Sequence, residues 1–173
     1  MKSERIRYFV EGECEKKLID ALKSSYFLPS GKVTVFNALT KVFSNSRLMD
    51  LTTGSIVILV FDTDGEQDIS ILNNNISVLK KHVSNVKVFN LISVRNLEDE
   101  LVRSTIISNI EELTGSRSRT DFKSSFLRLK DCLNVLQRHG FNFDLMWCTK
   151  PDGVFSGFRQ GIGDITKWVN RRD

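Results

Sequence analysis

The stretch Ile56-Val57-Ile58-Leu59-Val60-Phe61-Asp62-Thr63-Asp64-Gly65 decides the fold class of this chain. Six consecutive apolar residues are followed by an Asp-Thr-Asp-Gly sequence. An apolar run of this length is typical of a strand buried on both faces, as in parallel sheets that are covered by helices. Ligands of such sheets bind beyond the carboxyl ends of the strands. Asp62 and Asp64 therefore stand where a binding site is expected, although Asp is also a common helix N-cap residue.

The rest of the chain alternates between strand patterns and helix patterns around this run. Taken in order, the expected elements are strand 6–10, a helix around Leu18 and Leu22, strand 32–36, helix 42–51, strand 56–61, helix 66–83, strand 86–93, helices 105–113 and 121–139, strand 143–148 and a partly helical end. This order predicts an α/β fold with a mostly parallel sheet and helices on both of its faces. We interpret residues 1–173 as a single domain, with a core over about residues 5–103 and a C-terminal helical extension over 104–173.

Acidic residues follow three of the expected strands. Glu11 comes directly after strand 6–10, Asp62 ends the central run, and Glu98 follows strand 86–93. The carboxyl ends of parallel strands meet at one edge of a sheet, so these acids are expected to converge. Close carboxylates repel one another, and Mg²⁺ is an oxygen-preferring cation that relieves the repulsion. Each acid taken alone has a simpler explanation, because acidic residues are favourable in the first turn of a helix.

The composition is that of an ordinary globular protein. Hydrophobic residues make up 40% and charged residues 27% of the 173 residues, and no apolar run reaches the roughly 20 residues of a membrane span. The chain starts without the apolar region of a signal peptide, and its three cysteines show no zinc pattern, so we expect a cytoplasmic protein with reduced thiols and no membrane partner. Basic and acidic side chains balance in residues 1–102, so residues 103–173 carry the whole net charge of +4. A basic half beside an acidic edge suits a polyanion, although a solvated face explains it nearly as well.

Two motifs of the chain resemble those of the TOPRIM domain. Phe9-Val10-Glu11-Gly12-Glu13-Cys14-Glu15 matches a strand that ends in Glu-Gly, and Val60-Phe61-Asp62-Thr63-Asp64-Gly65 matches a later strand that ends in Asp-x-Asp. The form Glu-Gly-x-x-Glu is most similar to the nuclease branch, which includes the OLD-like nucleases and small TOPRIM proteins of anti-phage defence systems. The resemblance covers about residues 5–103. It implies a TOPRIM-like sheet and a metal-dependent nuclease, the effector of such a defence system.

The resemblance also implies which residues hold the metal, Mg²⁺ or Mn²⁺. Glu11 matches the motif glutamate, which acts as a metal ligand or as a general acid or base. Asp62 and Asp64 match the metal-binding aspartates. Glu15 matches the second acid of the OLD-like branch, and Glu98 is the favoured choice for a further acid after a later strand. Two cations about 4 Å apart could clamp the attacking and leaving oxygens of a phosphodiester.

A nuclease also needs groups that stabilise the phosphate. Members of the nuclease branch use a lysine near the metal, and Lys150, which follows the last expected strand, is the candidate in this chain. Basic residues near and within the helix expected over 121–139 are candidates to hold the substrate backbone without reading its sequence, namely Arg117, Arg119, Lys123 and Arg128. No nucleic-acid-binding motif favours one substrate, so the predicted activity is endonucleolytic cleavage of DNA or RNA, with tRNA included. The implied partners are nucleic acid and a separate ATPase or other defence-system protein, and a homo-oligomer stays open.

Other interpretations compete with a nuclease. The stretch Phe61-Asp62-Thr63-Asp64-Gly65 also resembles the aspartate motif of haloacid-dehalogenase-type phosphatases, but there the motif normally opens the chain and is followed by Thr or Val rather than Glu66. An EF-hand does not fit, because its acids keep a 12-residue loop pattern that is absent here. A non-catalytic TOPRIM module could bind metal, nucleic acid or a partner protein. The intact acids at Glu11, Asp62 and Asp64 favour catalysis over binding alone.

Overall fold

The computed structural model describes residues 5–65 and 68–169, which form an α/β fold around one four-stranded parallel sheet of Rossmann-like type. The strands are β1 (Ile6–Val10), β2 (Lys32–Val35), β3 (Ile56–Asp62) and β4 (Lys87–Ser93), in the spatial order β2-β1-β3-β4. The α-helices are α1 (Glu13–Ser24), α2 (Asn45–Met49), α3 (Ser70–His82), α4 (Leu97–Arg103), α5 (Glu111–Thr114), α6 (Arg119–Arg128), α7 (Cys132–Arg138) and α8 (Ile162–Ile165). Short 3-10 helices are η2 (Phe143–Leu145), η3 (Gly153–Phe155) and η4 (Thr166–Trp168). The strands expected before residue 104 are all confirmed.

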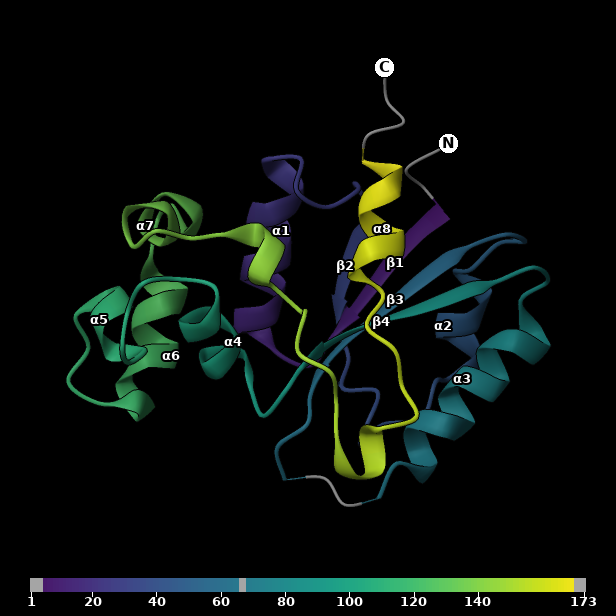
Figure 1. The fold of residues 1–173 in the computed structure, drawn as a ribbon. Helices are drawn as coiled ribbons and strands as arrows, with labels where there is room; N and C mark the ends of the chain where they lie inside the picture. The colour runs from purple at the N-terminus through teal and green to yellow at the C-terminus, as the bar shows by residue number, and fades with distance from the viewer. Residues whose placement is uncertain (1–4, 66–67, 170–173) are drawn as a thin grey trace.

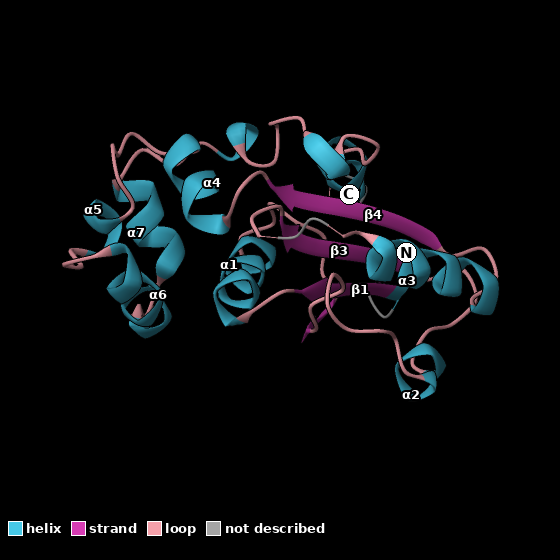
Figure 2. Cartoon of the chain, turned by 90° about the horizontal axis from the view of Figure 1, so that it is seen from below, coloured by secondary structure: helices cyan, strands magenta, loops and turns pink. Residues whose placement is uncertain are grey.

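Strand β3 lies between two hydrophobic cores, which explains its uninterrupted apolar sequence. All seven of its residues are buried. The side chains at positions 56, 58 and 60 join the core shared with α1, α6 and α7, and those at 57, 59 and 61 join the core shared with α3 and the loop before α2. Figures 1 and 2 show α1 and α4 to α7 on one side of the sheet and α2 and α3 on the other. The expectation of helices on both faces is therefore confirmed.

The expectation of one helix over residues 121–139 is wrong, because two helices, α6 and α7, occupy this region. The Lys17 ammonium of α1 donates to the carbonyl oxygen of Leu127, at 2.7 Å, and to that of Leu129, where α6 ends. The Asp131 side chain then caps the first turn of α7. The apolar spacing continues through residues 121–139 and by itself predicts one helix. The Lys17 ammonium at the end of α6 and the Asp131 cap at the start of α7 divide it into two.

Other expected elements are shorter than predicted or absent. The helices expected over 42–51 and 105–113 are shorter in the structure, where they correspond to α2 and α5. The helix expected over 66–83 corresponds to α3, which begins at Ser70, and residues 66 and 67 lie outside the described ranges. The strand expected over 143–148 is wrong, because the 3-10 helix η2 forms there. Trp147 has a φ of 53°, which lies in the left-handed region and does not occur within a regular strand. Within the part of the chain that is described, no helix is long and apolar enough to cross a membrane.

The C-terminal segment covers the outer edge of β4. The Gln160 side chain accepts a hydrogen bond from Ile92 N at 2.9 Å and donates to Ile92 O at 2.6 Å, as the backbone of a neighbouring strand would. The backbone N–H of Gly161 donates to Asn90 O at 2.7 Å, and a Cβ at Gly161 would lie only 3.0 Å from that oxygen. Figure 1 shows α8 following this contact alongside β4. The backbone groups of Ile92 and the carbonyl of Asn90 on the outer edge of β4 therefore have partners without a fifth strand.

On the face of the sheet that α2 and α3 cover, one buried side-chain amide holds the loop before α2 against α3. The Asn75 side chain is fully buried. Its Oδ1 accepts from Phe43 N at 2.9 Å, and its Nδ2 donates to Ala38 O at 2.9 Å and to Lys41 O at 2.8 Å. This side chain therefore satisfies three backbone groups of a loop that has no regular structure of its own.

We expect the substitution Asn75→Ala to lower the free energy of unfolding by about 2–4 kcal/mol, because it leaves buried backbone groups without partners. Urea denaturation measures this change. Asn74→Ala is the matched control, since Asn74 is exposed on the same helix and should change stability by less than about 0.5 kcal/mol. Equal effects of the two substitutions would contradict the role assigned to Asn75.

Candidate functional site

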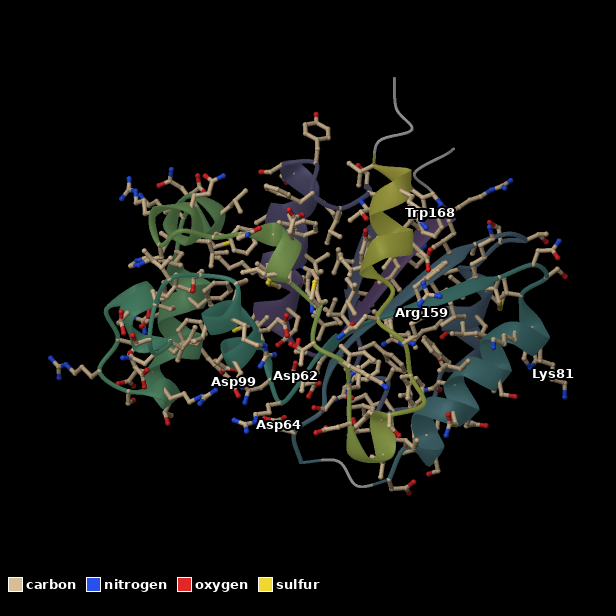
Figure 3. The ribbon with its side chains drawn as sticks, in the orientation of Figure 1. Asp62, Asp64, Lys81, Asp99, Arg159 and Trp168 are labelled. Carbon is tan, nitrogen blue, oxygen red and sulfur yellow. The ribbon has the colours of Figure 1, made fainter. Side chains whose placement is uncertain are left out.

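Four acids lie around one cleft at the carboxyl edge of the sheet. Glu11 follows β1, Asp62 ends β3, Asp64 lies two residues further on, and Glu98 lies in the first turn of α4 after β4. Because β1, β3 and β4 are parallel, their ends present these residues on the same side. The cleft has a volume of about 460 Å³ and is lined by Glu11, Asp62, Asp64, Asn96, Glu98, Arg119, Thr120 and Lys123. Figure 3 shows Asp62, Asp64 and Asp99 gathered in this region, whereas Lys81 and Trp168 lie far from it.

Backbone hydrogen bonds join the loops after β3 and β4 and so fix the spacing of the acids. Asp64 N donates to Arg95 O at 2.8 Å, and Arg95 N donates to the hydroxyl of Thr63 at 2.8 Å. Arg95 has a φ of 71°, in the left-handed region, which turns the chain into α4. The N-cap residue Asn96 accepts from Asp99 N at 3.0 Å and donates through Nδ2 to the Asp64 carboxylate at 3.1 Å. The cap of α4 therefore also positions one of the candidate ligands.

Asp62 is the most strongly perturbed acid of the cleft. It is only 9% exposed, and burial followed by the nearby charges of Glu15 and Glu11 raises its pKa to about 8. Its Oδ2 accepts from Leu97 N at 3.3 Å, but its buried Oδ1 has no hydrogen-bond partner among the described residues. Ser93, which lies beside Asp62 on β4, lowers the pKa of Asp62, but by less than burial and the two glutamates raise it. Without a bound cation, ionisation of the Asp62 carboxyl group therefore lowers the stability of the folded protein.

The two glutamates near β1 have different surroundings. The Glu11 carboxylate accepts a hydrogen bond from Asp62 N at 3.1 Å, so it lies directly against the end of β3. Glu15, in the first turn of α1, is buried and does not line the cleft, but burial and the charge of Glu11 raise its pKa. A Cβ at Gly12 would lie 2.9 Å from the Glu15 carboxylate, so this glycine gives the side chain room. Glu15 thus does not line the cleft, but its charge is close enough to raise the pKa of Asp62.

The three consecutive acids of α4 have separate roles. Glu98 lines the cleft, and its carboxylate lies 3.8 Å from the Lys123 ammonium, which raises the pKa of that lysine. Asp99 pairs with the Arg119 guanidinium. Glu100 is fully buried, where it accepts from an Arg103 nitrogen at 2.6 Å and from Trp147 N at 2.5 Å. The structure therefore brings Glu98, which the sequence favoured, to the cleft, whereas Glu100 ties the C-terminal segment to α4.

Two of the predicted basic residues reach the cleft. Arg119 and Lys123 lie on α6 and line it, with side chains that are 52% and 69% exposed. Arg117, Arg128 and Lys150 are not among the lining residues. Lys150 was placed after a strand that does not form, and it lies exposed beyond η2. Lys123, which the sequence analysis named only as a contact to the substrate backbone, is thus the lysine that the fold brings to the acids. Its closeness to them depends on how α6 packs, which no local pattern of the sequence shows.

The side chains of the cleft do not form a ready coordination shell. Among residues 5–65 and 68–169, no group of three or more His, Cys, Asp or Glu side chains is arranged to hold a metal ion. The contacts described above give the physical reason, because Glu11 faces a backbone amide, Asp64 faces Asn96 and Glu98 faces Lys123. A cation would have to replace these partners.

Comparisons of the chain with protein-family models, with curated proteins and with solved structures found no significant match. What the structure itself defines is a Rossmann-like α/β protein with an acidic cleft, bordered by two cations, at the carboxyl edge of its sheet.

The raised pKa of Asp62 makes a prediction about pH. Folding raises this pKa from about 3.9 in an unfolded chain to about 8, so the folded state binds more protons between these values and stability falls as pH rises through this window. In EDTA we expect the melting temperature of the protein to fall between about pH 5 and pH 8. Asp62→Asn should weaken this dependence and stabilise the protein at pH 8, because it removes a buried charge that repels its neighbours.

Thermal unfolding followed by circular dichroism at several pH values measures this effect. The matched control is Asp152→Asn, because Asp152 is exposed and its side chain makes no capping hydrogen bond. A lower melting temperature for Asp62→Asn than for the wild type at pH 8 would mean that the ionised carboxylate stabilises the fold, contrary to our interpretation.

Proposed function

We propose that the acidic cleft binds Mg²⁺ or Mn²⁺ and that the protein is a metal-dependent endonuclease acting on DNA or RNA, tRNA included. The observation that carries this proposal is the convergence of Glu11, Asp62 and Asp64 from two adjacent strand ends, with Lys123 facing Glu98 across the same cleft. The order of the motifs, Glu-Gly after the first strand and Asp-x-Asp after the third, supports our assignment of the fold to the TOPRIM type. The role as effector of an anti-phage defence system, in the cytoplasm and with a separate ATPase or other partner, rests on the resemblance alone.

The donor atoms of the cleft fit a hard divalent cation. Carboxylate and amide oxygens are the ligands that Mg²⁺ and Mn²⁺ prefer. Asp62 contributes a buried oxygen that has no hydrogen-bond partner among the described residues. Its pKa is raised first by burial and then by repulsion from Glu15 and Glu11, and a bound cation would favour the ionised carboxylate against both. Glu11, Asp62, Asp64 and Glu98 would hold the ion, with Glu15 adding negative charge close to Asp62. A bound ion would polarise the phosphoryl oxygen and lower the pKa of its water.

The residues of α6 supply the positive side of the proposed site. Contact with Glu98 raises the pKa of Lys123, so its ammonium stays charged at neutral pH. Lys123 and Arg119 are both half-exposed or more, so each can turn from its acidic partner toward a phosphate. Such contacts hold the sugar–phosphate backbone and carry no sequence information, which suits a nuclease of broad specificity. We therefore assign to Lys123 the role that the resemblance had given to Lys150.

Two alternatives are weighed against this proposal. The first is a non-catalytic module that binds nucleic acid or a partner protein, which is favoured by the protein partners that Glu11, Asp64 and Glu98 already have in the cleft. A haloacid-dehalogenase-type phosphatase would use Asp62 as its nucleophile. The burial of Asp62 and its raised pKa disfavour that role, because a nucleophilic carboxylate must be ionised and must reach its substrate.

The decisive experiment is incubation of the purified protein with plasmid, single-stranded DNA and total tRNA in Mg²⁺, Mn²⁺ or EDTA. We expect one substrate class to be cut only in metal, and Asp62→Asn and Glu11→Gln to abolish cleavage. Lys123→Ala should lower kcat by about 10²–10³-fold, since it removes a cation that faces the phosphate.

The matched control for Lys123→Ala is Lys130→Ala, because Lys130 is exposed just after α6 and does not line the cleft. Loss of cleavage on Lys150→Ala rather than on Lys123→Ala would restore the sequence-based choice of lysine. Binding of nucleic acid without cleavage under every metal condition would favour the non-catalytic module.

A further inference from the structure

One ion pair of the acidic cleft joins a buried acid to an exposed cation. The Glu98 carboxylate and the Lys123 ammonium lie 3.8 Å apart, and both residues line the cleft. The Glu98 side chain is only 6% exposed, whereas that of Lys123 is 69% exposed. Glu98 is packed in the first turn of α4, but Lys123 extends from α6 on a long and flexible side chain. The cation can therefore leave the pair more easily than the acid can.

Departure of Lys123 from this pair costs free energy while the cleft holds no metal. Among the described residues, Lys123 provides the one ion pair of the Glu98 carboxylate. A buried carboxylate that loses its partner keeps an uncompensated charge, which lowers stability. The exposure of Lys123 makes this cost smaller, since water screens part of the attraction. A phosphate that draws Lys123 away must still offset the cost of leaving Glu98 unpaired.

A divalent cation in the cleft would replace Lys123 as the partner of Glu98. Glu98 is one of the four acids that we propose as ligands, so the metal and the ammonium compete for the same carboxylate. A bound divalent ion is often the largest local charge in a site, so it stabilises the ionised Glu98 and repels the ammonium. Metal binding therefore lowers the cost of moving Lys123 toward a phosphate. In the same way, Lys123 opposes metal binding until it moves.

The second cation of the cleft is arranged differently. The Arg119 guanidinium pairs with Asp99 and donates to the Asn96 side chain at 2.9 Å. Asp99 is not among the residues that line the cleft, so a metal ion held by the candidate ligands would not compete directly for it. Arg119 therefore carries the same charge in the same cleft, but its ion pair is with an acid outside the candidate ligands. This difference provides a control within the site.

We infer that the Glu98–Lys123 ion pair is an autoinhibitory contact, through which a divalent metal ion and a nucleic-acid phosphate each strengthen the binding of the other. The inference rests on the proposed function, because it assigns a regulation to the same cleft. Coupling of this kind is reciprocal, and its usual size is about 5–150-fold in affinity. In the metal-free protein the ammonium neutralises Glu98, and in the metal-bound protein it is available to the phosphate. The metal-free cleft therefore binds nucleic acid weakly although its cations are present.

The first test is isothermal titration of the full chain with Mn²⁺, without nucleic acid. Lys123→Gln should strengthen Mn²⁺ binding by about tenfold, because Glu98 is then free to bind the metal. The matched control, Arg119→Gln, should change the affinity by less than about threefold, since it removes a charge without releasing a candidate ligand. When Glu98→Gln is already present, Lys123→Gln should change the affinity by less than about twofold.

Two results of this titration would contradict the inference. One is Mn²⁺ binding by Lys123→Gln that is no tighter than that of the wild type. The other is a gain on Lys123→Gln that persists in full when Glu98→Gln is present, because it would indicate general charge repulsion rather than competition for one carboxylate.

The second test measures nucleic-acid binding in EDTA, by the fluorescence anisotropy of one labelled DNA and one labelled RNA oligonucleotide. Glu98→Gln should strengthen binding of the preferred oligonucleotide severalfold because it releases Lys123, an outcome that damage to the fold would not produce. The gain should disappear when Lys123→Gln is also present. No gain, or an equal gain with and without Lys123, would overturn the inference.

These measurements separate failure of the inference from failure of the proposed function. A wild-type protein that cuts nucleic acid in Mn²⁺, but whose variants show neither gain, contradicts the inference and leaves the nuclease intact. A protein that shows both gains and cuts no substrate contradicts the nuclease and supports the coupling of its two ligands.

Discussion

Carboxylates at the carboxyl edge of the sheet repel one another, and much of the surrounding structure keeps them in place despite that repulsion. Asp62 ends a strand in which every residue is buried, so the sheet fixes the position of its backbone beside the cleft. Glu11 is held against the backbone amide of Asp62, and Asp64 is held by the cap of α4. The hydrophobic cores on both faces of β3 therefore stabilise a strained electrostatic arrangement at its end.

The partial relief of this repulsion comes from the half of the chain that carries no recognised motif. Lys123 and Arg119 belong to α6, whose Phe122 and Phe126 are buried in the same core as Tyr8 and Ile58 of the sheet. The buried Glu100 carboxylate of α4 accepts from Trp147 N and so links that half to α4, and the partly exposed Arg103 pairs with the same carboxylate. The acidic edge and its cations are thus parts of one packed unit, and neither half forms the cleft alone.

The sequence predicted the features that depend on short patterns. The apolar runs before Glu11 and Asp62 marked buried strands, and parallel topology then required their acids to converge. It failed where distant contacts decide the outcome. The break between α6 and α7 depends on Lys17, which lies 110 residues before the carbonyl of Leu127 that it binds. The exchange of Lys150 for Lys123 has a similar cause, since the path of the chain after α4 places α6, and not the segment after η2, beside the acids.

The contact of residues 160–161 with the outer edge of β4 has a consequence for folding during synthesis. Strand β4 is complete at residue 93, yet the side chain that satisfies its outer edge, Gln160, is 68 residues away from its partner Ile92. A ribosome adds residues at about 5–20 per second, so for several seconds the nascent sheet carries an open hydrogen-bonding edge. An exposed edge of this kind pairs readily with other strands. Protection against misassembly therefore comes only after another 67 residues have been added, through Gln160 and the glycine that follows it.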